Sequence, residues 1–199
     1  ARMLERGATP EGREAAFRWI LRLMDIFPGD IGSLAPLVLN HIVVEPGQSV
    51  FIAPGELHAY LSGTCLELMA NSDNVIRGAL TRKHVDLPEL VSVLSFNPER
   101  VVPVAPARAA GGEECYPIFV PDFQISRIAL EPGGSWRRPS TEPEILLCAS
   151  GRAVARATDG GELALERGRS AFAAADAGAY ALRSEEGALL YRASVPEIP

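Results

Sequence analysis

The stretch from Gly47 to Gly63, GQSVFIAPGELHAYLSG, decides how the fold of this chain is interpreted. A glycine opens the apolar run Ser49–Ile52, a turn follows at Pro54–Gly55, and a second apolar run begins at Leu57. Short apolar runs at near-regular spacing, separated by Gly and Pro turns, are typical of a β-sandwich or a small barrel. The stretch therefore predicts two strands joined by a tight turn.

The same rhythm extends on both sides of this stretch and returns later in the chain. Further strands are predicted at 41–44 and 64–70, and a second strand-rich region is predicted from Pro117 to Val195. In that region LEPGGS at 130–135 echoes VEPGQS at 44–49, and a turn is predicted at Ser150–Gly151. The pattern predicts a mainly β protein with two copies of one jelly-roll plan.

Helical patterns flank the first strand region. Apolar residues recur at helical spacing between Glu11 and Phe27, with Phe17, Ile20, Leu21 and Met24 on the repeat. Pro28-Gly29-Asp30 ends that helix, a short helical segment is predicted over 31–39, and another is predicted over 88–94. Residues 97–115 are rich in Pro, Ala and Gly, which favours a linker.

Composition excludes several classes of protein. The 199 residues carry a net charge of −6 with both signs interspersed, so a nucleic-acid-binding footprint is not expected. The apolar runs are too short to cross a bilayer. The three scattered cysteines favour buried, unpaired thiols in a reducing cytoplasm. Because the chain opens with Ala1 inside a helical pattern, we expect it to begin partway through a domain.

His58 is the main candidate for a metal ligand. It follows Gly55 by three residues, and a turn of this kind aims the start of the next strand into a barrel, where an imidazole can reach a metal. A satisfied structural histidine is the competing interpretation. Other donors close in sequence are His41, Glu56, Glu67 and His84.

The possible companions of His58 are less clear. Glu67 lies nine residues later and could ligate a metal, orient a ligand or move a proton, or could be a partly exposed strand carboxylate. His41 and His84 fit the surface or a position behind the ligands. No His-x-His pair exists in the chain, and the region from Pro117 to Val195 contains no histidine. We therefore expect that second region to be structural, with Glu142 and Glu144 in a loop.

Arg77, Arg82 and Lys83 form a basic cluster in an acidic chain, which suits a small anionic substrate. Lys83 is the only lysine among the 19 cationic residues, so its position could require an ammonium group, although codon bias would also explain it. A solvated loop is the alternative for the cluster. In that case Asp73 and Asn74 are simply turn formers.

The stretch PGELHAYLSGTCLELMANSDNVIRGALTRKHVDLPELVSVLSF at 54–96 resembles the signature region of type I, zinc-dependent mannose-6-phosphate isomerases. The preceding DIFPGDIGSLAPLVLNHIVVEPGQSVFI at 25–52 is similar to the segment that leads into it, and the resemblance is weaker from Tyr116 to Pro196. The resemblance implies a C-terminal portion of the family's two cupin-like jelly-roll barrels. Its implied domains are 1–30 as the end of a helical insertion, 31–96 as the second half of the catalytic barrel, 97–115 as a linker and 116–199 as the C-terminal barrel.

The resemblance also implies a role for each candidate residue. His58 matches the last zinc ligand; Tyr60, Glu67 and Asp73 match residues that line the site. Arg77 matches the arginine assigned to catalysis, and Lys83, with Arg82 beside it, matches the residues near the substrate phosphate. The family's other zinc ligands, a Gln-x-His pair and a Glu, have no match here.

The implied reaction interconverts mannose 6-phosphate and fructose 6-phosphate through a cis-enediol, with zinc polarising the substrate oxygens. The residues do not identify the catalytic base. Two other functions remain open at this point: a non-catalytic sugar-phosphate-binding cupin module, and a structural module that serves assembly alone. The oligomeric state is not indicated.

Overall fold

The computed structural model describes residues 10–72, 74–97, 101–118 and 120–196. The chain divides into two compact units, one made of Ala1–Pro46, Val50–Thr64 and Ser72–Pro103, the other of Gly47–Ser49, Cys65–Asn71 and Val104–Pro199. The helices are α2 (Pro10–Ile26), η1 (Ile31–Leu37), α3 (Leu87–Val93) and η2 (Ala110–Gly112). The strands are β1 (Ala107–Arg108), β2 (Glu114–Cys115), β3 (Gln124–Leu130), β4 (Ser135–Ser140), β5 (Glu144–Ala157), β6 (Glu162–Glu166), β7 (Ser170–Ala173), β8 (Gly178–Arg183) and β9 (Ala188–Ser194).

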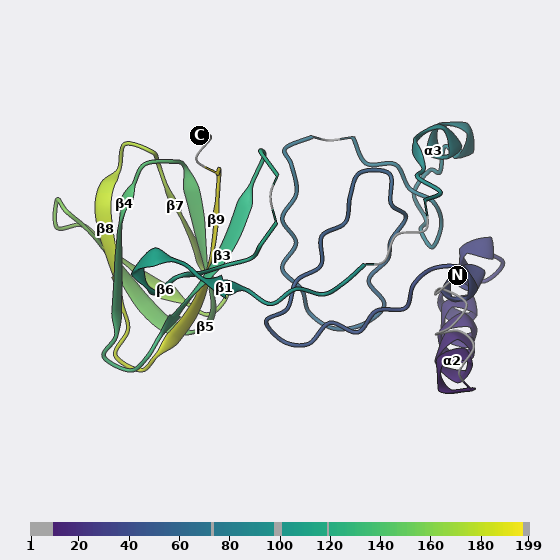
Figure 1. The fold of residues 1–199 in the computed structure, drawn as a ribbon, viewed down its shortest axis with the longest axis horizontal. Helices are drawn as coiled ribbons and strands as arrows, with labels where there is room; N and C mark the ends of the chain where they lie inside the picture. The colour runs from purple at the N-terminus through teal and green to yellow at the C-terminus, as the bar shows by residue number, and fades with distance from the viewer. Residues whose placement is uncertain (1–9, 73, 98–100, 119, 197–199) are drawn as a thin grey trace. The chain divides into compact units, whose positions relative to one another are not determined.

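The first unit holds the predicted helices (Figure 1). α2 matches the predicted 11–27 within one residue at each end, but it buries the stripe Ala16, Ile20 and Leu23. Phe17, Leu21 and Met24, which also recur at helical spacing, are exposed. Two apolar stripes run along this helix, and periodicity alone did not indicate which of them packs inside.

The two shorter helices of this unit begin at aspartates. The Asp30 carboxylate accepts a hydrogen bond from the Gly32 amide at the start of η1, and the Asp86 carboxylate accepts one from the Glu89 amide at the start of α3. An aspartate in this position satisfies amides that have no partner inside the helix. Both predicted short helices are confirmed, although η1 is a 3₁₀ helix.

The strands predicted at 41–44, 49–52, 57–61 and 64–70 are not formed. Within the described residues of this region the backbone forms turns and segments without regular structure, and its one bridge joins Ser49 to Val104 through hydrogen bonds of 2.9 and 2.8 Å. The turn predicted at 54–55 is present, and a further turn lies at 46–47. A strand depends on the hydrogen bonds of a neighbour, and these segments find no ladder partner in the described chain. The turn at 54–55 was therefore predicted correctly and the strands were not.

The second unit is a curled antiparallel sheet with the order β1-β2-β3-β9-β5-β8-β4, and β6 and β7 also pair with β5. In Figure 1, β4 and β8 face β7, β9 and β3 across the interior. The 14-residue strand β5 makes this possible, because its first half pairs with β7 and β9 and its second half pairs with β6 and β8. This unit has the jelly-roll character that the second strand region predicted.

The turn predicted at Ser150–Gly151 does not exist. β5 continues through it with a register shift between Cys148 and Ser150, and Gly151 adopts a φ of 71°. A Cβ at Gly151 would lie 2.1 Å from the Gly187 carbonyl oxygen, so only glycine fits. The glycine therefore marks a β-bulge, which bends one strand from one layer into the other.

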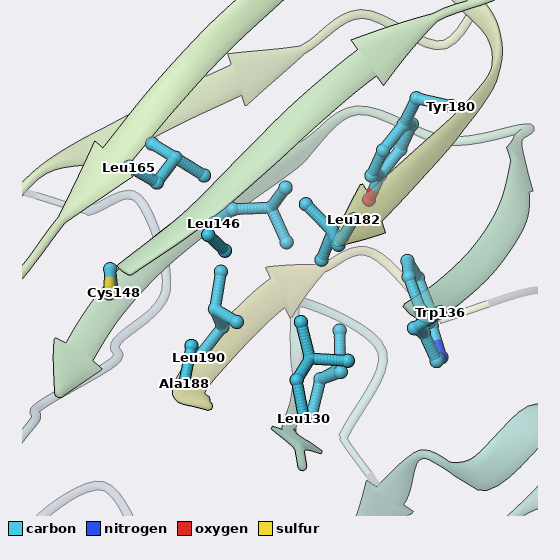
Figure 2. Close-up of a cluster of buried hydrophobic side chains, with 11 residues drawn as sticks. Leu130, Trp136, Leu146, Cys148, Leu165, Tyr180, Leu182, Ala188 and Leu190 are labelled. Carbon is cyan, nitrogen blue, oxygen red and sulfur yellow. The ribbon is translucent and has the colours of Figure 1, made fainter. Parts of the chain in front are cut away.

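Apolar side chains from both layers meet inside this unit. Ile128, Leu146, Leu165, Leu182 and Leu190 are each buried to 2% exposure or less. Figure 2 shows Leu182 near Trp136 and Tyr180, whose ring centroids lie 5.9 Å apart. Strict inward–outward alternation along β3 and β9 produces this core.

The same interior contains buried charge, which was not expected. The Arg192 side chain is 1% exposed; its Nε lies 2.9 Å from Glu113 Oε1, and its Nη1 lies 2.9 Å from Glu144 Oε2 and 3.4 Å from Glu142 Oε1. Arg138 pairs with Glu113 and Glu142. The prediction that Glu144 lies in a loop is wrong, because it is a fully buried residue at the start of β5.

Three further observations complete the fold. The predicted linker 97–115 includes β1, η2 and β2, and β2 pairs with β3. Cys65 is exposed, Cys115 is half-buried and Cys148 is buried, and all three are free thiols, so the expectation of burial fails at Cys65. Within the described residues, no helix has both the length and the apolar character needed to cross a membrane.

Candidate functional site

The turn that precedes His58 is stabilised by its own hydrogen bonds and by close packing against the end of α3. The Glu56 amide donates to the Ala53 carbonyl, and the Ala53 amide donates to the Glu56 carboxylate, both at 3.2 Å. Gly55 has a φ of 82°, and a Cβ there would lie 2.7 Å from the Val93 carbonyl oxygen at the end of α3. The turn therefore requires glycine, and it holds the start of the following segment in place.

His58 is an exposed side chain, and one of its ring nitrogens contacts a backbone carbonyl. Its Nδ1 lies 2.9 Å from the Glu56 carbonyl oxygen, and since a carbonyl only accepts, Nδ1 carries the proton of the neutral ring. The lone pair is then on Nε2, which is the arrangement of a metal-binding histidine whose other nitrogen bonds a backbone carbonyl. Tyr60 lies edge-on to the ring with centroids 5.8 Å apart. The geometry suits one ligand contributed by this segment.

The segment that carries Arg77 lies beside the His58 segment. A Cβ on Gly78 would lie 2.7 Å from a methyl of Leu57 and 3.6 Å from one of Leu90. Gly78 therefore packs directly against the residue before His58. Arg77 itself is half-buried. This packing brings the predicted catalytic arginine and the predicted ligand onto adjacent segments of one unit.

Arg82 and Lys83 are exposed and follow a sharp backbone reversal. Leu80 has a φ of 54°, and its amide donates to Asp30 Oδ2 at 2.8 Å. The Lys83 amide donates to the Thr81 hydroxyl at 3.1 Å. Sequence reasoning did not identify Asp30 or Leu80 as functional. The available signal was an aspartate two residues before a glycine at the start of a helix.

The remaining candidates are not brought together by the structure. Glu67 is exposed and belongs to the other compact unit, so its position relative to His58 is not described. Asp73 lies outside the described residues. The His41 ring lies edge-on to Trp19 at 6.4 Å, and His84 is exposed.

The described residues contain no group of three or more His, Cys, Asp or Glu side chains that could hold a metal ion. Zinc in a catalytic site takes about three protein ligands. The donor set of the described residues therefore does not fit a zinc site by itself, although His58 fits one ligand of such a site.

Comparison with known proteins gives a consistent result. The chain is 40% identical over 157 residues to the mannose-6-phosphate isomerase of Salmonella typhimurium, and 31% identical over 190 residues to a probable mannose-6-phosphate isomerase of Caenorhabditis elegans. These matches cover 77% and 94% of this chain, but only 39% and 45% of the relatives. The chain thus spans less than half the length of either relative. No family model matches it.

Solved structures agree with the sequence matches. Mannose 6-phosphate isomerase from Salmonella typhimurium, in its apo form, matches with a TM-score of 0.78 and 34% identity over 92% of this chain and 48% of that chain. A structure of the same enzyme bound to its substrate, fructose 6-phosphate, and a zinc atom also matches with a TM-score of 0.78. The mainly β, cupin-like fold with an N-terminal helix, predicted from the sequence, is therefore confirmed. The chain belongs to the mannose-6-phosphate isomerase family.

Proposed function

We propose that this chain supplies part of the active site of a zinc-dependent isomerase that interconverts mannose 6-phosphate and fructose 6-phosphate. The observation that carries the proposal is the match to a Salmonella typhimurium enzyme whose structure holds fructose 6-phosphate and zinc. The geometry of His58, with Nε2 as the lone-pair nitrogen, supports it. Because this chain spans only about half of that enzyme, the activity belongs to a complete protein that also contains the remaining part.

In the proposed site, His58 is one metal ligand and Arg77 stabilises the negative charge that develops on the substrate. Lys83 and Arg82 bind the phosphate group, Lys83 as a point charge and Arg82 as a fork. Tyr60, Glu67 and Asp73 line the cavity around the sugar. Zinc, when bound, supplies polarisation of the substrate oxygens. The proton-moving base is not assigned to a residue of this chain.

The domain assignments and the cellular location belong to the same proposal. Residues 31–96 form the second part of the catalytic barrel and 116–199 form the C-terminal barrel, with 97–115 between them. A cytoplasmic location is supported by three free thiols, since a reducing compartment preserves them.

The test uses this chain joined to the part of the Salmonella typhimurium relative that it does not span. We expect this complete protein to retain one zinc and to isomerise mannose 6-phosphate, whereas the 199-residue chain does neither. Arg77→Ala lowers kcat by at least ~100-fold, in line with the loss of one charge-stabilising group. Arg13→Ala, which removes an exposed arginine of α2, leaves the rate unchanged. A near-normal rate for Arg77→Ala would remove Arg77 from the mechanism.

The alternative is a sugar-phosphate-binding module without catalysis. The basic cluster Arg77, Arg82 and Lys83 supports it, because these side chains can bind a phosphate group without a metal. Saturable binding of mannose 6-phosphate by the complete protein, with no turnover in the presence of zinc, would establish this alternative.

A further inference from the structure

The loop that carries the basic cluster contains a residue in an unusual backbone conformation. Leu80, with a φ of 54°, is the one residue other than glycine that has a positive φ within the described residues. A side chain with a Cβ disfavours this left-handed region, so leucine adopts it only where its surroundings compensate. Such residues concentrate where a loop must hold one particular shape. Leu80 lies three residues after Arg77 and two before Arg82.

The Asp30 side chain stabilises the unusual conformation of Leu80, although the two residues are far apart in the sequence. Its Oδ2 accepts the Leu80 amide at 2.8 Å, and its Oδ1 accepts the Gly32 amide at 2.8 Å. The carboxylate is part-buried, and 50 residues separate it from Leu80. Hydrogen bonds to a carboxylate are stronger than those to a neutral acceptor. One side chain therefore caps η1 and fixes the reversal at Leu80.

Close packing at Gly32 reinforces this connection. A Cβ on Gly32 would lie 2.4 Å from the Cβ of Ala79 and 3.2 Å from the Cγ of Leu80. The start of η1 and the Leu80 loop are thus in contact, and Gly32 leaves the space that the Asp30 hydrogen bonds require. The loop is held against η1 by side-chain, backbone and packing contacts together.

The cations on this loop differ from the paired, partly or fully buried arginines of the second unit. Arg127, Arg138 and Arg192 are paired with buried or half-buried glutamates. Arg77, Arg82 and Lys83 have no carboxylate within ion-pairing distance in the described part of the chain. A rigid loop that presents unpaired cations is suited to an anionic group such as a phosphate.

We propose that Asp30 is a positioning residue for phosphate binding. It stabilises the left-handed conformation of Leu80, and this conformation determines the direction in which Arg82 and Lys83 leave the reversal. The proposal rests on the proposed function for the identity of the anion. Its own claim is narrower, because it concerns how the loop binds a phosphate group and not the isomerisation.

The first test measures phosphate binding by the 199-residue chain with NMR, using inorganic phosphate and following the amides of Arg82 and Lys83. Asp30→Ala is expected to weaken the dissociation constant by at least ~10-fold, because the charged acceptor that holds the loop is lost. Asp30→Asn, which keeps one acceptor oxygen, gives a smaller loss. Asp86→Ala is the matched control: it removes an aspartate that caps α3 through Glu89 and has no bond to Leu80.

The decisive variant is Asp30→Ala combined with Leu80→Gly. Glycine adopts a positive φ without steric cost, so the double variant should recover most of the phosphate affinity if Asp30 acts through Leu80. A purely structural role predicts no such recovery. Unchanged affinity in Asp30→Ala would overturn the proposal, as would failure of Leu80→Gly to restore it, or the absence of a phosphate response in the unmodified chain.

The second test uses the complete protein and separates this proposal from the proposed function. Asp30→Ala should raise KM for mannose 6-phosphate by at least ~10-fold with little change in kcat, the pattern of a lost binding contribution. An equal fall in kcat at unchanged KM would contradict it. A complete protein that binds phosphate but shows no turnover would refute the isomerase function and leave the role of Asp30 intact.

Discussion

The two strand-rich regions share a sequence rhythm but differ in what the rhythm produces. Residues 41–70 and 130–195 both alternate short apolar runs with Pro and Gly turns. Only the second region forms a sheet, in which β5 alone pairs with four other strands. In the first region one isolated bridge forms. The local pattern therefore specifies the turns, and a sheet additionally needs partner strands in the same molecule.

Apolar side chains are buried where their strands pair with neighbouring strands, and they are more exposed where no sheet forms. Leu182 and Leu190 in the barrel are fully buried at 0% exposure, whereas Leu57, on a segment with the same apolar pattern, is 42% exposed. The apolar side chains of the first region are thus available for packing with further strands. This difference explains why the barrel should have a measurable stability of its own, whereas the 41–70 segments should depend on the rest of a complete protein.

The largest effect is expected from the buried charges of the barrel. Arg192→Met leaves Glu144 buried without its cation and leaves Glu113 with Arg138 alone, at 3.7 Å. Breaking a buried ion pair in this way typically costs about 3–5 kcal/mol of unfolding free energy. Urea unfolding measures this, with Trp136 fluorescence as the barrel probe in a Trp19→Phe background. Arg156→Met is the control, because its pair with Glu162 is exposed and should contribute less than about 1 kcal/mol.

A loss below about 1 kcal/mol for Arg192→Met would show that the barrel tolerates unpaired carboxylates. Water would then have to reach the interior end of β9. In that case the barrel and the first region would be more alike than their burial indicates.

A smaller effect is expected when apolar side chains of the two regions are truncated. Leu182→Ala should cost about 2–5 kcal/mol in the 199-residue chain, whereas Leu57→Ala should cost less than about 1 kcal/mol. In the complete protein the cost of Leu57→Ala should rise, because partner strands then cover it. Thermal and urea unfolding of both variants in both proteins give the four values. Equal costs for Leu57→Ala in the two proteins would mean that the segment stays uncovered.

The sequence predicted those features that depend on neighbours along the chain. The helix at Pro10–Ile26 and the short helices at Ile31–Leu37 and Leu87–Val93, predicted over 11–27, 31–39 and 88–94, all have local signals. His58 was identified for the same reason, since its turn is local. Its role as a metal ligand, and the roles of Arg77, Lys83, Arg82, Glu67, Asp73 and Tyr60, remain predictions.

Features that join distant residues were missed. The bond between Asp30 and Leu80 spans 50 residues, and that between Arg192 and Glu113 spans 79. An aspartate in a turn and a glutamate near a proline look like surface residues when only the sequence is available. The bulge at Gly151 was interpreted as a turn because glycine serves both structures equally well.

The smallest effect concerns the pH dependence of the barrel. Burial, followed by the nearby Glu144 carboxylate, raises the pKa of Tyr180. Burial, followed by Tyr191, raises the pKa of Tyr116 to about 12, and the Tyr116 hydroxyl donates to the Gly47 carbonyl at 2.8 Å. A phenol with a raised pKa stays protonated in the folded state after its unfolded counterpart, near pH 10, has lost the proton.

The stability that these phenols contribute is therefore complete below about pH 10 and is lost as pH rises further, by at most about 1.4 kcal/mol per pH unit for each group. Tyr180→Phe should reduce this slope in urea unfolding between pH 9.5 and 11, values chosen to bracket the unfolded pKa of about 10. Tyr116→Phe should reduce it as well, and its effect should end near pH 12, because Tyr116 then ionises in the folded barrel too. If Tyr180→Phe left the slope unchanged, the phenol would ionise as readily in the barrel as in the unfolded chain. The interior end of the barrel would then be open to solvent, as the unpaired segments of the first region are.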